Sequence, residues 1–548
     1  MSIPFPAINL KKLKGQLDWK LLLFLVLFLD VKLAVKIAAI VLIYILQADF
    51  RFGFRLKGSR LPLFYPLIMV LAIIGAFVNA SLTAHNYWPA FLTGLGFWIL
   101  CLLAIHQVKL AVERNDATVI HRTLLVFFIL NAGVSLLNIG LIIFRINEIN
   151  PYTYQGEYQK YFINTGDYIK GITFDTSTTN AIISAFGVIY FLVRKNGWMM
   201  LVCMFTLLLT VSNTLNILLI GTLMLLFIFK SSREQKSLIA ACVFLLVLFM
   251  AKISPQNNEY VVETVNNILH RPNKKIVPLY APIPIQLRPD STLNPEEKRE
   301  KGAQLALDSI NHVHQAAPVA KVNKPLATNN GRIFTPKDSI YTAHYQSLVS
   351  TPTDELPLVA FIDQHKTELP VSGQAFHWSG TPGKVIAAKQ TVDFFKTHPA
   401  KLITGDGIGN FSSKLAFKTT GLNITGGYLA KKVYIDHDFL TNHLDLYLNY
   451  FSKRAGYHSL TNSPFSVYDQ VLAEYGIAGL LAFAIYYLWF FVKKAKVLTY
   501  GLPILLLLLP VLAIDYWFEQ LSIIILFELL LLLDIKESTA KAQLQYER

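Results

Sequence analysis

Long apolar segments recur along this chain and constrain its fold more than any other feature. A helix needs roughly 20 mainly apolar residues, within a range of about 17–25, to cross the hydrocarbon core of a bilayer. Only 16% of the residues are charged, whereas soluble globular proteins contain about 25%. The sequence therefore predicts an all-α polytopic membrane protein. Its hydrophobic runs are 20–47, 61–84, 88–107, 122–144, 176–193, 197–211, 213–229, 236–252, 467–492, 498–514 and 516–534.

The loops between these runs differ in charge, which predicts the side of the membrane that each one faces. The connections near 81–87, 212–213 and 514–517 contain no Lys or Arg. Cytoplasmic loops of membrane proteins contain an excess of Lys and Arg, so the basic loops are predicted to be cytoplasmic. This placement explains the net charge of +15 without a nucleic-acid partner. The basic loops lie near 51–60, 109–122, 194–195, 230–236 and 493–496.

The first hydrophobic run is too long for one ordinary helix, and Asp30, Lys32 and Lys36 interrupt it. It forms either one tilted helix or two short helices that turn near Asp30. The second arrangement places the basic N-terminus in the cytoplasm with the other basic loops, so we favour it. The chain then has about twelve membrane-spanning helices with both ends in the cytoplasm.

This topology divides the chain into four regions. Residues 1–252 hold the N-terminal membrane helices, and 253–465 form one large outer loop between the ninth and tenth helices. Residues 466–534 hold the C-terminal membrane helices, and 535–548 form a cytoplasmic tail.

The large outer loop has two parts of different composition. Residues 271–389 are rich in proline and polar residues, and such segments bury too little apolar area to offset the entropy of ordering. Residues 391–460 are rich in Phe and Tyr. We expect this second part to pack as short helices on the membrane surface.

A glycine-rich stretch, Gly405-Asp-Gly-Ile-Gly-Asn-Phe-Ser-Ser-Lys414, lies within the aromatic part of the loop. Glycine reaches positive φ at little cost and lets backbone N–H groups approach an anion closely. We therefore predict that a polar or anionic substrate group binds there; a purely structural turn is the alternative. Dinucleotide binding is disfavoured, because the third glycine is one residue early for G-x-G-x-x-G and no βαβ unit surrounds it. The predicted substrate-binding residues are Lys401, Gly405, Gly407, Gly409, Asn410 and Lys414.

A second polar stretch spans residues 462–480, where the chain re-enters the membrane. Gly476 and Gly479 permit close helix packing. A carboxylate in lipid is costly, so Glu474 is predicted to orient a neighbouring group or to act as a base. Glu528, deeper in the last hydrophobic run, is either functional or paired with a neighbouring helix.

Two further polar stretches, 174–181 and 210–216, also fall at the predicted outer face. The alternative to a functional role for Ser177 and Thr178 is that they simply cap the helix that begins there. All four stretches together place polar groups in one layer at headgroup depth. A solute carrier concentrates such groups near the midplane instead.

These stretches resemble the O-antigen ligase and polymerase family of bacterial membrane proteins. Its members carry G-x-G-x-G-N-F-S in a large periplasmic loop that ends H-N-x-Y-L-x-x-L-x-E-x-G-x-x-G. The resemblance covers most of the chain thinly and the two loop motifs well. It implies a bacterial inner-membrane protein whose large loop is periplasmic. The matching positions of the second motif are Tyr468, Leu472, Glu474, Gly476 and Gly479.

The chain departs from the family pattern at two functional positions. Phe465 and Ser466 replace the His-Asn pair, and Asn213 replaces an arginine that often follows serine in a mid-chain helix. A phenyl ring cannot accept a proton, so the family's base is missing. His458 is the nearest replacement base and Arg454 the nearest phosphate partner. The alternative for His458 is an exposed loop histidine without a catalytic role. The alternative for Arg454 is a contact with lipid phosphate.

The resemblance implies a glycosyltransferase that joins or transfers polyprenyl-diphosphate-linked oligosaccharide at the periplasmic face. It needs no metal and no cofactor. Lys401, Lys414 and Arg454 would bind anionic groups, and His458 and Glu474 are the candidate catalytic residues. Membrane lipid and polysaccharide assembly proteins are the expected partners.

Two alternatives come from other functional classes. A lipid-linked glycan flippase or exporter predicts internal repeats and charges near the midplane. A non-catalytic component of a polysaccharide assembly machine is motivated by Phe465 and Asn213.

Overall fold

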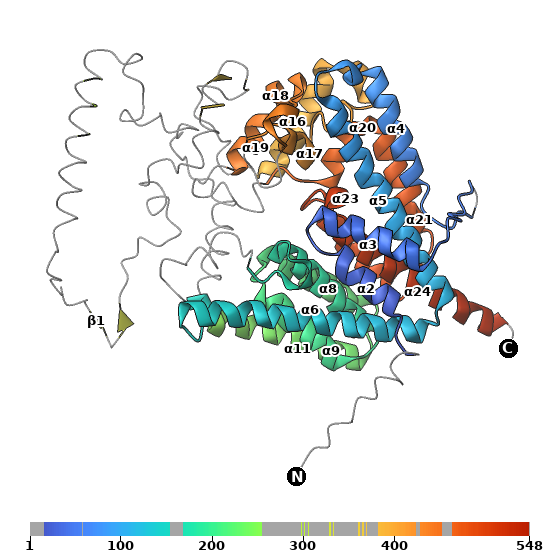
Figure 1. The fold of residues 1–548 in the computed structure, drawn as a ribbon. Helices are drawn as coiled ribbons and strands as arrows, with labels where there is room; N and C mark the ends of the chain where they lie inside the picture. Colours follow the sequence, from blue (N-terminus) through green and yellow to red (C-terminus); the bar gives the residue numbers. More distant parts are fainter. Residues whose placement is uncertain are drawn as a thin grey trace, which may run out of the picture.

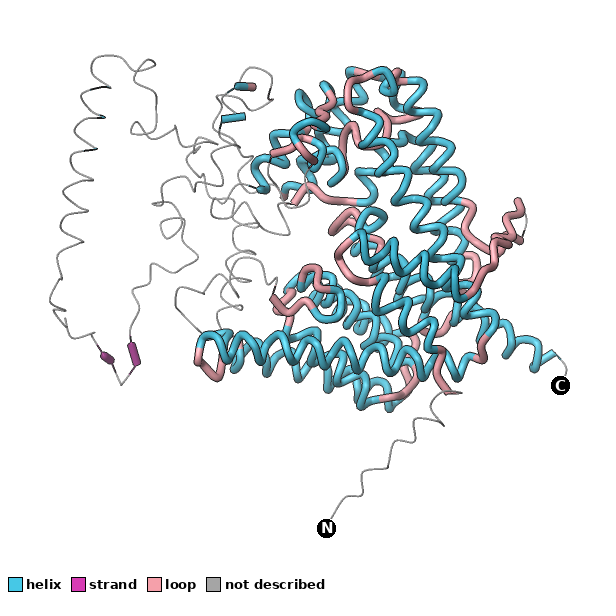
Figure 2. The backbone as a smooth tube through the Cα atoms, in the orientation of Figure 1, coloured by secondary structure: helices cyan, strands magenta, loops and turns pink. Residues whose placement is uncertain are grey.

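The computed structural model describes residues 16–56, 58–153, 168–254, 382–422, 428–451 and 463–546, with isolated short pieces between 298 and 369. Almost all described elements are helical (Figure 2). Within this part of the chain the strands are one short antiparallel pair, β1 (Thr328–Asn329) with β2 (Arg332–Ile333). The predicted helical architecture is therefore confirmed.

The N-terminal half contains nine α-helices in its described residues. Four of the helices in the described chain are long and apolar enough to cross a membrane: Tyr87–Arg114, Ala117–Ile146, Arg233–Ile253 and Val467–Val492. The prediction of about twelve spans stays a prediction. The nine helices are α2 (Trp19–Phe28), α3 (Leu33–Leu46), α4 (Phe64–Val78), α5 (Tyr87–Arg114), α6 (Ala117–Ile146), α8 (Ser177–Val193), α9 (Gly197–Leu209), α10 (Asn213–Phe229) and α11 (Arg233–Leu248).

The first hydrophobic run forms two helices, as the charges around Asp30 predicted. Helix α2 ends at Phe28 and α3 begins at Leu33. The backbone N–H of Val31 donates to the carbonyl oxygen of Thr173 at 2.8 Å, which holds the turn against the segment before α8. With 10 and 14 residues, both helices are shorter than the roughly 20 residues of a typical span.

The aromatic part of the large loop forms short helices at one end of α4 and α20 (Figure 1). Phe417, Tyr447 and Phe465 belong to one buried cluster that joins these helices to Tyr516. The proline-rich segment lies outside the described residues, except for the start of α16 and isolated short pieces. The helices are α16 (Gly383–Thr397), α17 (Lys414–Thr419), α18 (His437–Asn442) and α19 (Leu444–Phe451).

The C-terminal helices pack against α4 and α5 in the main buried core. Glu528 is fully buried in α24 and accepts a hydrogen bond from the Tyr65 hydroxyl of α4, so it pairs with a neighbouring helix. This arrangement is the second of the two alternatives that the sequence left open for Glu528. The helices are α20 (Val467–Phe483), α21 (Trp489–Val492), α22 (Gly501–Val511), α23 (Trp517–Gln520) and α24 (Ser522–Tyr546).

Candidate functional site

The glycine-rich loop lies against a break in α20. Gly476 has φ +65° and ψ −165°, so the helix ladder is interrupted there. The loop supplies the missing partners: the N–H groups of Asp406 and Gly407 donate to the carbonyl oxygens of Ala473 (2.9 Å) and Glu474 (3.0 Å). Because buried backbone groups need hydrogen-bond partners, loop and broken helix stabilise each other.

The amides of the three glycines all have protein acceptors. Gly405 N–H donates to the Lys401 carbonyl (2.7 Å), Gly407 to the Glu474 carbonyl (3.0 Å) and Gly409 to Glu474 Oε1 (3.0 Å). The prediction that these amides hold an anionic substrate group is therefore not supported. Their positive φ values serve a structural turn.

Asn410 is also committed to the protein interior. Its Nδ2 donates to Ser81 Oγ (3.0 Å) and to the Asp406 carbonyl (2.8 Å), and its Oδ1 accepts from the Tyr434 hydroxyl (3.0 Å). The side chain therefore joins the loop to the segment after α4. It is not available for the predicted contact with substrate.

Glu474 has a positioning role in this arrangement. The residue is 1% exposed, and its Oε1 holds the Gly409 amide. This geometry fits the orienting role that the sequence suggested.

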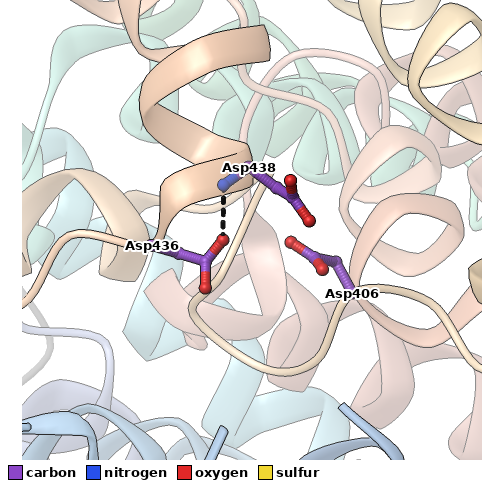
Figure 3. Close-up of side chains that lie close together, drawn as sticks. All are labelled: Asp406, Asp436 and Asp438. Carbon is purple, nitrogen blue, oxygen red and sulfur yellow. Dashed lines mark hydrogen bonds between the residues drawn. The ribbon is translucent and has the colours of Figure 1, made fainter. Parts of the chain in front are cut away.

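Asp406, Asp436 and Asp438 form an acidic cluster (Figure 3), and Lys401 contacts two of its members. Its Nζ donates to Asp406 Oδ1 and Asp438 Oδ2, both at 2.6 Å. Burial raises the pKa of Asp406 well above its ordinary value. Burial alone would lower the pKa of Lys401, but Asp406 and Asp438 raise it. One ammonium among three carboxyl groups does not attract a phosphate, so the predicted role of Lys401 is not supported.

Lys414 begins α17 and pairs with Asp515, with Nζ 2.7 Å from Oδ1. The same Nζ lies 4.9 Å from the ring centroid of Phe465. Phe465 is therefore a buried cation–π partner of a lysine. Lys414 remains at the predicted polar layer.

Lys418 lies one helical turn after Lys414, and the sequence analysis missed it. Burial lowers its pKa, and the like charge of Lys414 lowers it further, whereas Glu519 and Asp515 raise it. Asp175, from the stretch that begins α8, also raises the pKa of Lys418. The signal in the sequence is the spacing of four residues, which puts both lysines on one helix face.

A second group of polar side chains gathers where α20 begins. Ser412 Oγ donates to Asp469 Oδ2 (2.6 Å) and lies 3.0 Å from the Tyr516 hydroxyl, which contacts the Tyr447 hydroxyl. Asp469 follows Phe465 by four residues. Asp469 was not among the predicted site residues, although a carboxylate one helical turn after Phe465 was a signal in the sequence.

Lys384 of α16 joins this group from the side. Its Nζ donates to Ser463 Oγ (2.8 Å) and to the carbonyl oxygens of Phe465 (2.7 Å) and Ile514 (3.0 Å). Burial lowers its pKa to about 7. The side chain thus joins α16 to the segment before α20 and to the segment between α22 and α23.

His443 is a buried histidine that the sequence analysis did not consider. Its Nδ1 lies 2.9 Å from Gln390 Oε1, and its ring stacks on Phe411 with centroids 4.9 Å apart. Burial lowers its pKa to about 3, so the imidazole is neutral.

Some of the remaining predicted residues lie in the part of the chain that the structure describes, and others do not. His458 and Arg454 lie outside the described residues. Ser212 and Asn213 begin α10. Of the four polar stretches, the structure brings the first two into direct contact and places Asp175 of the third in electrostatic contact with Lys418.

Comparisons with protein-family models, curated proteins and solved structures found no match for this chain. The chemistry of the site therefore stands on its geometry. Two lysines on one helix face suit two phosphate groups, and a nearby carboxylate can accept a proton from a hydroxyl.

Proposed function

We propose that the chain is a membrane-embedded glycosyltransferase that uses a polyprenyl-diphosphate-linked oligosaccharide. The observation that carries this proposal is the pair Lys414 and Lys418 on one face of α17. Lys414 Nζ lies 4.9 Å from the ring centroid of Phe465, and that ring lies 5.2 Å from the ring of Tyr516, which belongs to the group that contains Asp469. Cations stabilise a diphosphate leaving group, and a carboxylate can take the proton of the acceptor hydroxyl. We assign these roles to the two lysines and to Asp469.

The proposal includes a membrane setting. In it, about twelve helices cross a bacterial inner membrane, and the loop helices α16–α19 lie on the periplasmic side. Large apolar side chains such as Ile45 (74% exposed) and Phe144 (87% exposed) would then face lipid. A lipid-linked substrate reaches such a site laterally from the bilayer.

The test is complementation of a deletion strain with site variants. Lys414→Ala/Lys418→Ala and Asp469→Asn should abolish polymer or glycan transfer and leave lipid-linked repeat units on the outer face. Asparagine keeps an oxygen that can accept from Ser412. The matched control is Lys431→Ala/Lys432→Ala, because both of these lysines are exposed on the same loop.

The position and length of the intermediates separate the candidate functions. Single repeat units that accumulate outside support a polymerase, and completed chains that fail to reach an acceptor support a ligase. Units trapped inside would point to a flippase or exporter. Full activity of both site variants would reject the assigned residues and favour a non-catalytic component.

A further inference from the structure

Two buried oxygen atoms on one face of α20 have no hydrogen-bond partner among the described residues. They are Glu474 Oε2 and Gln470 Oε1, from side chains that are 1% and 3% exposed. Residues four apart on a helix are neighbours on its surface. An unpaired buried acceptor costs about 1–3 kcal/mol, and more for a charged group, so two on one face indicate an absent donor or cation.

The orientation of both side chains is set by their other atoms. Glu474 Oε1 accepts from the Gly409 amide at 3.0 Å. Gln470 Nε2 donates to Glu519 Oε1 at 2.6 Å, so the amide oxygen is the free atom. Glu519 Oε2 accepts from the Leu415 amide at 3.1 Å.

These three side chains line one small pocket between α5, α17, α20 and α23. The remaining wall is apolar or aromatic, which excludes bulk water and strengthens electrostatic interactions inside. It consists of Gly94, Phe97, Trp98, Ile408, Leu415, Tyr475 and Phe518.

No ion pair compensates the two glutamates in the described part of the chain. No Lys or Arg nitrogen there lies within 4.0 Å of a carboxylate oxygen of Glu474 or Glu519. The acidic cluster around Asp406 differs, because the Lys401 ammonium contacts two of its carboxylates at 2.6 Å. The aspartate cluster thus holds a lysine ammonium in direct contact, whereas Lys414 and Lys418 act on Glu519 only from beyond ion-pair distance.

We propose that Glu474 Oε2, Gln470 Oε1 and the Glu519 carboxylate bind a divalent cation, Ca²⁺ in preference to Mg²⁺. Two carboxylates match the charge of a divalent ion. Ca²⁺ accepts amide and carboxylate oxygens in irregular geometry, whereas Mg²⁺ demands a near-ideal octahedron and retains several waters. This site does not depend on the proposed glycosyl transfer.

The bound cation would join three elements. Glu474 holds the glycine loop through Gly409, and Glu519 holds the start of α17 through the Leu415 amide. A cation bound between the two carboxylates would therefore fix the glycine loop and the start of α17 to α20. It thus supports the loop next to Lys414 without contact with the reacting groups.

The test is calorimetric titration of the purified, chelator-treated full-length chain with CaCl₂. We expect one ion per chain and weaker binding of MgCl₂. Glu474→Gln and Glu519→Gln keep the hydrogen bonds to Gly409 and Leu415 and should raise the Kd by at least about 10-fold. Asp438→Asn, in the aspartate cluster, should leave the Kd unchanged.

A luminescent probe locates the ion even where a variant folds poorly. Tb³⁺ substitutes for Ca²⁺ and is sensitised by a nearby indole, and Trp98 lines the pocket. Trp98→Phe should remove most of the Tb³⁺ emission while calcium binding persists. Absence of calcium binding, loss of binding in Asp438→Asn, equal binding of NaCl or MgCl₂, or emission unchanged in Trp98→Phe would each overturn the site.

Discussion

Gly405 and Gly476 meet backbone to backbone, and neither position has room for a side chain. A Cβ on Gly476 would lie 2.6 Å from the Gly405 nitrogen and 2.4 Å from the Ile403 oxygen. A Cβ on Gly405 would lie 2.3 Å from the Glu474 carbonyl carbon. The contact lets the glycine loop complete the hydrogen bonds of the broken helix α20.

Alanine at either glycine should therefore destabilise the protein strongly. Both residues have positive φ, which costs roughly 1–2 kcal/mol for an L-residue, and the backbone overlap adds about 1–3 kcal/mol. We expect Gly405→Ala and Gly476→Ala each to lower the melting temperature of the detergent-purified protein by many degrees. Gly96→Ala in α5, where a Cβ meets nothing within 4 Å, is the control. Wild-type stability in Gly476→Ala would contradict the close backbone contact between Gly405 and Gly476.

The glycine loop illustrates which parts of the structure could be predicted from the sequence. Alternating glycines indicated a loop with special backbone geometry, and the hydrophobic runs indicated helices at α5, α6 and α20. The acceptors of the glycine amides were not predictable, because Gly476 frees the carbonyls of Ala473 and Glu474 only in the folded chain.

Which lysines have their charge neutralised by nearby carboxylates could not be read from the sequence either. Lys401 looked like a free cation, since its partner Asp438 lies 37 positions away and reaches it only through the packing of α18. Lys418 was visible in principle, because it repeats Lys414 after one helical turn. The role of a residue in a loop of this length depends on tertiary contacts that local patterns do not contain.

Stability should fall in acid because of His443. Its folded-state pKa of about 3 lies below the ordinary value of 6.5, so its contribution is complete above pH 6.5 and is lost as the pH falls toward 3. Each pH unit in that window costs about 1.4 kcal/mol. His443→Gln removes this term, so its acid-side loss of melting temperature should be smaller than that of the wild type.

The comparison with wild type is essential, since Asp445 titrates in the opposite direction. Burial raises its pKa to about 7, so its contribution is complete below pH 3.8 and is lost as the pH rises toward 7. The exposed His437 provides the matched control for the His→Gln substitution itself, through His437→Gln. Identical profiles for His443→Gln and wild type would show that His443 is not buried as a neutral ring.

Tyr65 and Glu528 offer a test of the contact between α4 and α24. Tyr65→Phe removes the hydroxyl that donates to Glu528 and leaves a buried acceptor, at a cost of about 1–3 kcal/mol. Combining Tyr65→Phe with Glu528→Leu removes both polar groups and should recover most of that loss. Melting temperatures of the two single variants, the double variant and the wild type measure the coupling. Strictly additive effects would exclude a direct interaction.

Labelling of single cysteines tests the topology on which the proposed function rests. Val385 of α16 is 56% exposed, and Val497, beside three lysines of a predicted cytoplasmic loop, is 47% exposed. A membrane-impermeant maleimide added to intact spheroplasts should label Val385→Cys and not Val497→Cys, whereas both should react after lysis. The background is low because the native Cys101, Cys203 and Cys242 are buried. The proposal places the basic loop that contains Val497 in the cytoplasm by the positive-inside rule, and α16 on the opposite side. Labelling of Val497→Cys but not Val385→Cys in intact spheroplasts would invert the membrane and remove lipid-linked sugars of the outer face as substrates.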